Sequence, residues 1–234
     1  MSPAFVLQRW PYQDTSLLLE LYSKDKGRFR AIAKGAKRPK SPWRSILQPF
    51  IPLQVETRGL NELQTLVQAE ALAEALPLSR VTLYSAFYVN ELVQRLTTPY
   101  HVHDELFDAY HQTLTLLSQT AQVEPVLRRF EWQLLWYLGH GFDWYHDTDG
   151  QAIQPEQSYL FMPEAGFTLC LEQTELVATA LVRGTDILRL SQFDVGEPRL
   201  LILFKRIMRM ALQPYLGSQP LRSREFFLQY KEMS

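Results

Sequence analysis

The chain has 234 residues, is 46% hydrophobic and carries a formal net charge of −1 at pH 7, so it can bury a sizeable core in one large or two small domains. Its single cysteine, Cys170, excludes an intramolecular disulfide framework, and no apolar run approaches the roughly 20 residues that span a bilayer. The N-terminal segment lacks the pattern of a signal peptide. We therefore expect a soluble protein of the reducing cytoplasm with no membrane partner.

The charges are unevenly distributed along the chain. Residues 24–44 hold nine Lys or Arg and one Asp, a local charge of +8, so the remainder carries −9. Residues 140–182 contain seven acidic residues and no Lys or Arg, whereas residues 199–231 hold seven basic residues and one acidic residue. This segregation favours a polyanion-binding surface with acidic surfaces elsewhere.

The first seventy residues are predicted to form five short strands, because apolar or alternating runs are separated by turn-forming segments. The runs are AFVLQRW (4–10), TSLLLELY (15–22), GRFRAIAKG (27–35), ILQPFIPLQVE (46–56) and ELQTLVQAEAL (62–72). Five strands in so short a segment predict a small closed antiparallel barrel, of which the oligonucleotide-binding (OB) barrel is one form. Pro49 and Pro52 indicate that the fourth strand is bulged or lies at an edge.

The third strand and the loop after it hold the densest group of cations. Alternate side chains of a strand share a face, so Phe29, Ala31 and Ala33 are predicted inside the barrel and the basic residues outside it. The basic residues are Arg28, Arg30 and Lys34 on the strand and Lys37, Arg38, Lys40 and Arg44 on an irregular loop. Such a surface suits phosphates, with Tyr12 and Trp43 as exposed base-stacking candidates. A solvated loop that protects a sheet edge is the alternative, but the continuous basic face favours binding.

From about residue 80 the apolar residues recur at helical spacing. Helices are predicted at 82–96, 104–119, 124–139 and 198–217. Residues 140–182 break into turn-forming residues and short β-like runs, which predict a small irregular insert. The sequence therefore predicts an α+β multidomain protein, with an N-terminal closed five-stranded barrel at 1–79, of which the OB barrel is one form, a helical domain at 80–142 and 183–234, and the insert at 143–182.

The predicted helix 198–217 carries a basic stripe opposite an apolar face. Arg199, Lys205, Arg206 and Arg209 fall within an arc of about 120° at helical spacing. Two interpretations remain open. One is an ordinary amphipathic helix with a cationic outer face, and the other is a second DNA contact through Lys205, Arg206 and Arg209.

The predicted helix 124–139 carries two neighbouring arginines, Arg128 and Arg129, about one turn before Glu131 and Trp132. From spacing alone, an ion pair between residues three apart on a solvated face is the simpler interpretation. The functional alternative is a cationic rim beside an apolar groove. That arrangement would receive an acidic peptide with a hydrophobic end and clamp its carboxylates bidentately.

An enzymatic site receives little support from the sequence. FDWYHDTDG (142–150) gathers Asp143, His146, Asp147 and Asp149, residue types that bind metals or transfer protons. Their spacing fits no EF-hand, zincin or deaminase signature, and aspartates in a stretch ending in Gly are ordinary turn formers. No phosphate-binding glycine motif is present. We expect no catalytic residue, no metal and no cofactor.

Five segments taken together resemble one known family. They are KGAKRPKS (34–41), LQPF (47–50), LPLSRVTLYSAFYVNEL (76–92), EPVLRRFEWQLLWYLGHGF (124–142) and RMALQPYLGSQPLRSREFF (209–227). In this order the chain resembles RecO, the DNA repair and recombination mediator of bacteria, and in particular its gammaproteobacterial branch.

The resemblance implies an OB domain followed by a helical domain with a small zinc-finger-like insert. It also implies binding of single- and double-stranded DNA and annealing of complementary strands. With RecR, such a protein helps to load RecA onto DNA coated by the single-stranded DNA-binding protein (SSB), without catalysis. We accordingly expect a cytoplasmic, nucleoid-associated protein.

The resemblance also assigns residues. DNA binding falls on the basic strand and loop described above, and docking of the acidic, apolar-ended SSB tail falls on the helix of Arg128 and Arg129, so that docking now outranks the ion pair on a solvated face. Some family members bind zinc through four cysteines in the insert, whereas residues 140–182 contain only Cys170. A metal-free insert held by packing of Tyr159, Phe161, Phe167 and Leu169 is therefore expected. An OB-type RNA-binding or translation-associated module stays open as the alternative function.

Overall fold

The protein is described from a computed structural model, which covers residues 1–59, 62–171 and 180–223. Its contacts divide the chain into two units, residues 1–123 with 220–234 and residues 124–219. The division predicted from sequence follows changes in element type, whereas the contacts also join the first two long helices to the barrel.

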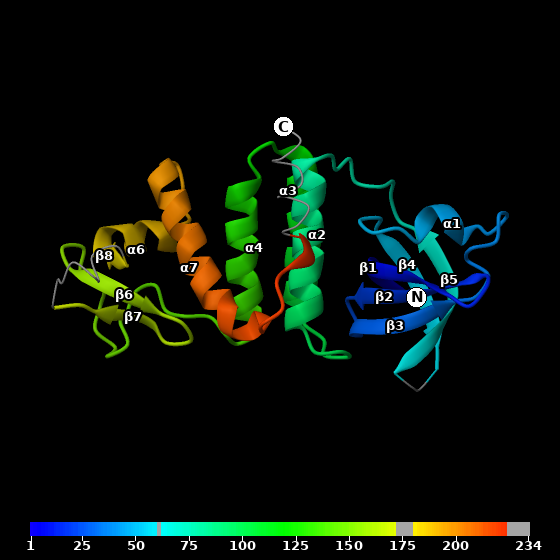
Figure 1. The fold of residues 1–234 in the computed structure, drawn as a ribbon, viewed down its shortest axis with the longest axis horizontal. Helices are drawn as coiled ribbons and strands as arrows, with labels where there is room; N and C mark the ends of the chain where they lie inside the picture. Colours follow the sequence, from blue (N-terminus) through cyan, green and yellow to red (C-terminus); the bar gives the residue numbers. More distant parts are fainter. Residues whose placement is uncertain (60–61, 172–179, 224–234) are drawn as a thin grey trace. The chain divides into compact units, whose positions relative to one another are not determined.

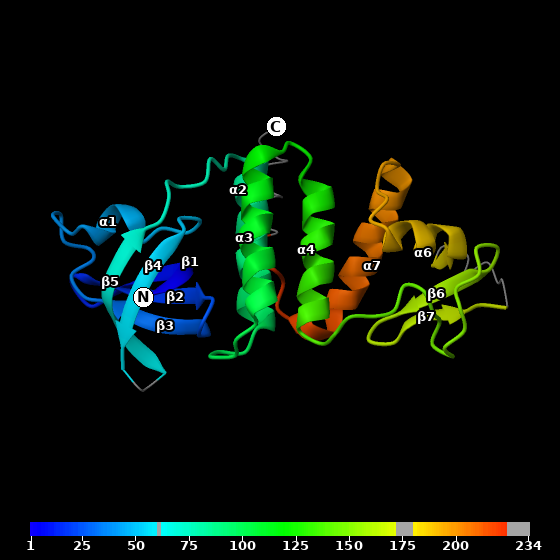
Figure 2. The same ribbon diagram turned by 180° about the vertical axis from the view of Figure 1, so that it is seen from behind.

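The N-terminal unit begins with a closed five-stranded barrel (Figures 1 and 2). The strands are β1 Ser2–Tyr12, β2 Ser16–Ser23, β3 Gly27–Ala33, β4 Leu53–Arg58 and β5 Leu63–Ala71. They pair in the order β1-β2-β3-β5-β4, and β4 closes the barrel on β1. β3 and β5 run parallel, and the other neighbours run antiparallel. The predicted OB-like barrel is confirmed.

The barrel interior is filled by alternate side chains of each strand. Phe29, Ala31 and Ala33 of β3 are buried, as the alternation predicted, and meet Leu19 and Leu21 of β2. The opposite face of β3 therefore points out of the barrel. This alternation sets which side chains are available for any contact outside the core.

The fourth strand is shorter than its apolar run predicted. Two prolines, Pro49 and Pro52, precede Leu53, where β4 begins. Because proline has no N–H to donate to a sheet ladder, the run pairs regularly only after Pro52. The preceding residues form a short helix, α1 Trp43–Ile46, whose apolar side chains pack against the barrel core.

Two helices complete the N-terminal unit, α2 Val81–Leu96 and α3 Asp104–Gln119, which lie side by side (Figure 1). Both were predicted from the apolar spacing. An aromatic cluster joins α3 to the barrel, because Phe5 and Tyr22 contact Phe107 and Tyr110 with ring centroids 5.2–5.9 Å apart. Burial raises the pKa of both tyrosines, so their hydroxyls stay neutral and the cluster behaves as core.

A buried polar network fixes α2 and the segment after it on the outer face of the sheet. Arg28 of β3 forms an ion pair with Glu20 of β2, and only 13% and 6% of the two side chains are exposed. The Arg28 guanidinium also donates from Nε to Thr97 Oγ1 at 3.1 Å and from Nη2 to the Thr97 carbonyl at 2.6 Å. Asn90 of α2 donates to the carbonyl of Leu7, where β1 is bulged. α2 and the segment after it thus cover the part of the outer face around Glu20 and Arg28.

Gly27 allows the segment after α2 to approach β3 closely. Its φ is +66°, and a Cβ at this position would lie 2.1 Å from the carbonyl oxygen of His101. The N–H of Tyr100 donates to the Arg28 carbonyl at 2.8 Å. A side chain at position 27 would therefore push this segment off the strand.

The C-terminal unit combines helices with a small sheet. Its elements are α4 Val123–Tyr137, β6 Ser158–Met162, β7 Gly166–Leu169, β8 Leu181–Arg183, α6 Gly184–Ser191 and α7 Pro198–Leu216. The sheet, in the order β7-β6-β8, lies within the predicted insert, where Tyr159, Phe161 and Phe167 are buried and Leu169 is half-buried. The sequence analysis did not predict α6.

Two kinds of feature are absent from the described ranges, a membrane-spanning helix and a cluster of metal-binding side chains. Within residues 1–59, 62–171 and 180–223, no helix is both long and apolar enough to cross a bilayer. In the same ranges, no three His, Cys, Asp or Glu side chains come together as a metal ion would require.

The buried ion pair yields a stability prediction. Replacing Arg28 with Met leaves the Glu20 carboxylate buried without its charge partner, and we expect a loss of about 3–5 kcal/mol in the free energy of unfolding. The matched variant Arg30→Met changes an exposed residue of the same strand, so it should alter stability by less than about 0.5 kcal/mol. Urea unfolding measures both, and equal midpoints would contradict the assignment. A Glu20→Leu, Arg28→Met double variant should recover most of the loss.

Candidate functional site

Six cations of the N-terminal unit lie on its surface and form what we call the basic surface. They are Arg30 on β3, Lys34 directly after it, Lys37, Arg38 and Lys40 in the following turns, and Arg44 on α1. All six are exposed. Among the residues that the structure describes, none of them forms an ion pair with an acidic side chain. Their charge is therefore available to an external polyanion.

The segment carrying the basic surface is more regular than the predicted irregular loop. Backbone N–H groups of Arg38, Ser41 and Arg44 each donate to a carbonyl three residues earlier, and Lys37 donates to the Thr15 carbonyl at 2.8 Å. Ala36 is buried, which holds the segment on the barrel. The cations thus project from a series of consecutive turns, because burying one small apolar residue anchors the chain between them.

A shallow cleft of about 400 Å³ brings part of this surface together. Its lining includes three cations, Lys34, Arg38 and Lys40, and the indole of Trp43. The sequence analysis treated Trp43 as an exposed stacking residue, but the structure shows it half-buried against the barrel core. Tyr12, the second stacking candidate, is also half-exposed.

Arg28 does not contribute to the basic surface. The alternation of β3 correctly placed it outside the barrel, on the same face as Arg30. Its guanidinium, however, is enclosed by Glu20 and Thr97 beneath the segment that follows α2. The structure therefore separates Arg28 from the other predicted DNA-binding residues of this strand.

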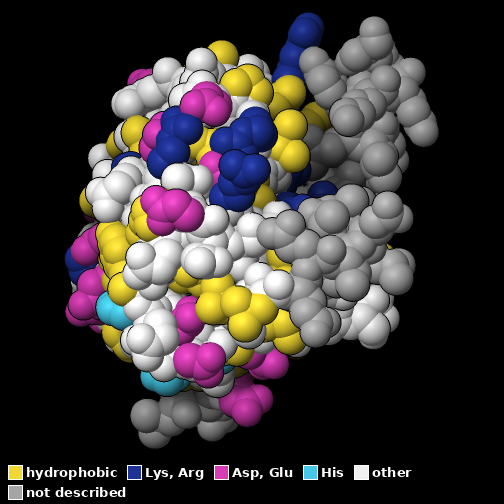
Figure 3. Space-filling model, turned by 90° about the vertical axis from the view of Figure 1, so that its left-hand side faces the viewer, with side chains coloured by type: hydrophobic (Ala, Val, Ile, Leu, Met, Phe, Trp, Pro, Cys, Tyr) yellow, Lys and Arg dark blue, Asp and Glu magenta, His cyan; other side chains and the backbone are white. Residues whose placement is uncertain are grey.

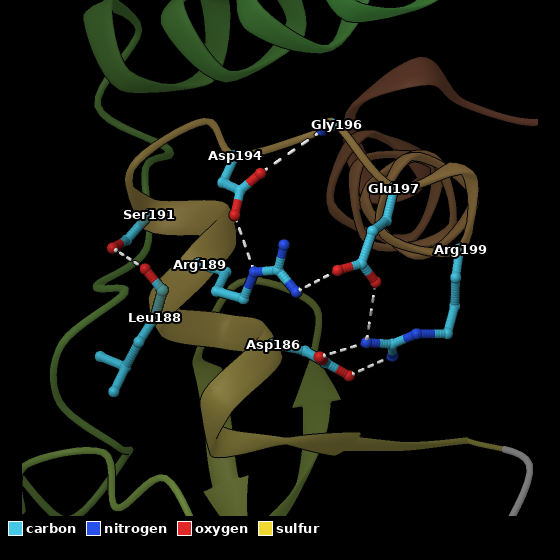
Figure 4. Close-up of polar contacts among 8 residues, drawn as sticks. All are labelled: Asp186, Leu188, Arg189, Ser191, Asp194, Gly196, Glu197 and Arg199. Atoms are coloured by element: carbon cyan, nitrogen blue, oxygen red, sulfur yellow. Dashed lines mark hydrogen bonds and ion pairs between the residues drawn. The ribbon is translucent and has the colours of Figure 1, made fainter.

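Two of the four cations of α7, Arg199 and Lys205, pair with carboxylates of the C-terminal unit. Arg199 pairs bidentately with the buried Asp186 at 2.6 and 2.8 Å, and Arg189 of α6 pairs with Asp194 and Glu197 (Figure 4). These carboxylates raise the pKa of both guanidinium groups, which stay charged. The network ties α6 to the start of α7 and holds three carboxylates against two guanidinium groups, so it has no excess positive charge.

The remaining basic residues of α7 differ in their surroundings. Lys205 pairs with Glu124 at 2.6 Å, and the Arg206 guanidinium lies 3.4 Å from the carbonyl oxygens of residues 180 and 181. Arg209 is exposed. On the face that carries β8 and α6, Lys and Arg side chains gather with Asp and Glu side chains among them (Figure 3). The basic stripe seen in the sequence is therefore not a continuous cationic patch.

A second candidate site is an apolar cleft of about 650 Å³ in the C-terminal unit. One wall is a single face of α4, because Arg129, Trp132, Gln133 and Trp136 recur at helical spacing. The other walls come from the segment after α4 and the end of α6, namely Gly141, Phe142, Asp143, Trp144, Tyr145, Ser191 and Phe193. A Cβ on Gly141 would lie 2.6 Å from the Trp136 ring, so glycine permits this close approach.

The rim of the apolar cleft carries charges of both signs. The Arg129 guanidinium lies over the Phe193 ring, 5.2 Å from its centroid, and is exposed. Burial alone would raise the pKa of Asp143, but hydrogen bonds from the Tyr145 N–H and His146 lower it below its usual value. Asp143 therefore stays ionised at neutral pH. An acidic ligand would be attracted at the Arg129 end and repelled at the Asp143 end.

The two neighbouring arginines of α4 have different roles. Arg128 lies on the buried face, where its Nη2 is 2.5 Å from Glu131 Oε1 and its Nη1 is 3.5 Å from Glu124 Oε2. Only 6% of its side chain is exposed. The ion pair between residues three apart, foreseen from spacing, thus exists but is buried rather than solvated. Only Arg129 of the two reaches the cleft.

The structure also shows what the sequence analysis missed. Of the cleft aromatics, only Trp132 had been singled out, although Trp136, Phe142 and Trp144 follow within twelve residues. The close spacing of these aromatic residues in the sequence could have indicated an apolar cleft. The acidic residues of the same stretch act locally, since Asp147 accepts hydrogen bonds from the N–H groups of Asp149 and Gln151, as in an ordinary turn.

Comparison with known proteins agrees with this arrangement. Residues 1–75 match the family model "Recombination protein O N terminal", and residues 78–225 match "Recombination protein O C terminal". The boundary between the two matches follows the end of β5.

Curated relatives extend the similarity over nearly the full chain. The DNA repair protein RecO of Idiomarina loihiensis is 46% identical over 227 residues, covering 96% of each chain. Those of Actinobacillus succinogenes and Haemophilus influenzae are 43% and 42% identical, covering 95% and 96% of this chain and 93% and 94% of their own. These organisms are gammaproteobacteria, so the predicted branch is confirmed. The chain belongs to the RecO family of DNA repair proteins.

Proposed function

We propose that this protein binds single- and double-stranded DNA through the basic surface and anneals complementary strands. The observation that carries the proposal is the set of six exposed cations without acidic partners among the described residues. Elsewhere, Arg28, Arg128 and Arg199 are each paired with a carboxylate. Within the described residues, the barrel thus presents a group of uncompensated positive charges on strand β3 and the turns after it.

Annealing on such a surface requires little beyond charge neutralisation. Two DNA strands repel one another through their phosphates, and a cationic surface that holds both lowers this repulsion and raises their local concentration. Base pairing then supplies the specificity. The protein therefore needs no reading of base edges and no catalytic residue, and we propose that it is not an enzyme.

The apolar cleft is proposed to receive the C-terminal tail of SSB. That tail, acidic with an apolar end, suits a cleft with aromatic walls and one arginine at its rim. The acidic part would lie toward Arg129, away from the ionised Asp143. Tethering to SSB would hold the protein beside SSB-coated DNA, where it competes for the strand.

Membership of the RecO family supports the wider assignment. We propose that the protein acts with RecR to help load RecA onto SSB-coated DNA during repair and recombination. Because its substrate would be chromosomal DNA, we place its action in the cytoplasm at the nucleoid. No residue is assigned to contacts with RecR.

Binding should weaken as salt concentration rises. About five neutralised phosphates predict a slope near −3.5 for log affinity against log salt on single strands. Fluorescence anisotropy with labelled oligonucleotides between about 50 and 200 mM salt measures this slope. A flat dependence would contradict the electrostatic account. RNA of the same sequence serves as a parallel arm, because preferential binding and annealing of RNA would favour the RNA-binding alternative.

Neutralising the turns of the basic surface should reduce the salt slope. Changing Lys37, Arg38 and Lys40 to Gln removes three charges, so we expect the slope to fall in magnitude by about 2. The matched triple variant Lys205→Gln, Arg206→Gln, Arg209→Gln removes three charges from α7 and tests the second DNA contact. We expect a clearly smaller change from it, and equal changes would make α7 an equal partner in binding.

Replacing each of the two arginines of α4 should affect a different property, peptide binding for Arg129 and stability for Arg128. Arg129→Gln removes a charged donor from the cleft rim, and we expect about tenfold to hundredfold weaker binding of an SSB-tail peptide with unchanged urea unfolding. Arg128→Met leaves the buried Glu131 without its partner, so it should lower the free energy of unfolding by about 3–5 kcal/mol. Peptide titration and urea unfolding of both variants decide the matter. Normal peptide binding by Arg129→Gln would reject the docking assignment.

A further inference from the structure

The outer face of the barrel carries an apolar row that neither the core nor the basic surface includes. The register pairs Trp10 of β1 with Leu18 of β2, and Leu18 with Ile32 of β3. Residues directly opposite one another across an antiparallel pair share a face of the sheet. The three side chains therefore form one cross-strand row, and each is partly exposed.

The apolar row lies at the edge of the region of the outer face that α2 and the following segment cover. The neighbouring row contains Gln8, Glu20 and Arg30 in register. Gln94 of α2 donates to Gln8 Oε1 at 3.0 Å, and Glu20 is buried in its pair with Arg28. Arg30, at the far end of that neighbouring row, is exposed. The apolar row lies next to this polar row. Its Trp10 indole is the first large aromatic side chain there that is partly exposed to solvent.

Cations of the basic surface border this indole. The Arg30 guanidinium lies over the Trp10 ring, 5.9 Å from its centroid, which is the outer limit of a cation–π contact. Lys34 directly follows the end of β3, two residues after Ile32, and is exposed. An aromatic plane beside cations that can reach phosphates is the arrangement on which unpaired bases stack.

We propose that Trp10 is a stacking platform for an unpaired base and gives the protein a preference for single-stranded over duplex DNA. This inference rests on the proposed DNA binding and deepens it. The base would lie on the indole, and Arg30 would turn from the ring toward the adjacent phosphate. In a duplex the bases are already stacked and paired, so only the phosphate contacts remain available.

The consequence for annealing follows from the same geometry. A single strand gains stacking and charge contacts, whereas the duplex product retains charge contacts alone. The protein would therefore release the annealed product more readily than it releases its substrates. Positive charge without the platform would hold both forms according to phosphate density only.

The test compares Trp10→Ala with Trp10→Phe and with Val67→Ala, which shortens an exposed apolar residue of β5. Losing one base stack should weaken single-strand binding about tenfold and leave duplex binding and the salt slope unchanged. The Phe variant should keep most of the affinity, and the Val67 variant should keep all of it. An unchanged ratio of single-strand to duplex affinity in Trp10→Ala would overturn the platform.

A second measurement has a wild-type arm, which does not depend on the folding of any variant. An oligonucleotide with abasic sites keeps its phosphates but offers no base to stack. The wild-type protein should bind it about tenfold more weakly than the intact strand, while Trp10→Ala should bind both alike. Equal binding of both strands by the wild type would refute the platform. Wild-type binding that does not depend on salt would instead refute the proposed charge-driven binding. Failure of the platform and failure of the proposed DNA binding therefore give different results.

Discussion

The buried pair of Glu20 and Arg28 marks a boundary on the outer face of the barrel, between the part that α2 and the following segment cover and the part that they leave exposed. Two charges held out of water are stable only with good geometry and further hydrogen bonds, and Thr97 supplies these from the segment that follows α2. Removing either charge would leave its partner buried alone. The pair thus holds the segment after α2 against the sheet and leaves the other part, with Arg30 and Trp10, open to solvent.

Among the described residues, the same contrast between paired and unpaired charge separates structural arginines from the cations that we propose for binding. Arg128 and Arg199 are held by the buried carboxylates of Glu131 and Asp186. The Arg128 pair lies within α4 and the Arg199 pair joins α7 to α6, and both leave little charge for a partner. The cations after β3 and Arg129 are exposed and, among the described residues, form no ion pair with a carboxylate. Counting basic residues in a segment therefore overstates its capacity for a polyanion, because a local carboxylate can cancel each one.

The two proposed sites use different physics, which suits a mediator. The proposed DNA contact at the basic surface would act through long-range charge and tolerate any sequence, because phosphates are the same along a strand. The apolar cleft acts through shape and burial, with Arg129 as its exposed arginine. A peptide with acidic and apolar parts would satisfy both the rim and the walls, whereas a nucleic acid would not. The two proposed sites would therefore select their partners by different chemistry.

Much of the fold could be read from the sequence because it depends on local patterns. The strand alternation around Phe29 and the helical spacing of α2, α3, α4 and α7 correspond directly to the structure. The fourth strand was overestimated since Pro52 interrupts pairing in a run that is otherwise apolar. α6 was missed because it has only eight residues, too few for its spacing to stand out.

The candidate sites were less predictable for a physical reason. By itself, the sequence determined the barrel, the helices α2, α3, α4 and α7 and the segment where positive charge gathers, because composition and periodicity are properties of neighbouring residues. The resemblance of five segments identified the family. Only the tertiary structure decided that Arg28 is buried while Arg30 is exposed, that Arg128 and Arg129 point to different surroundings, and that Trp10 lies beside Arg30. Each of these outcomes depends on which distant element covers a given face, and that contact is made only when the chain folds.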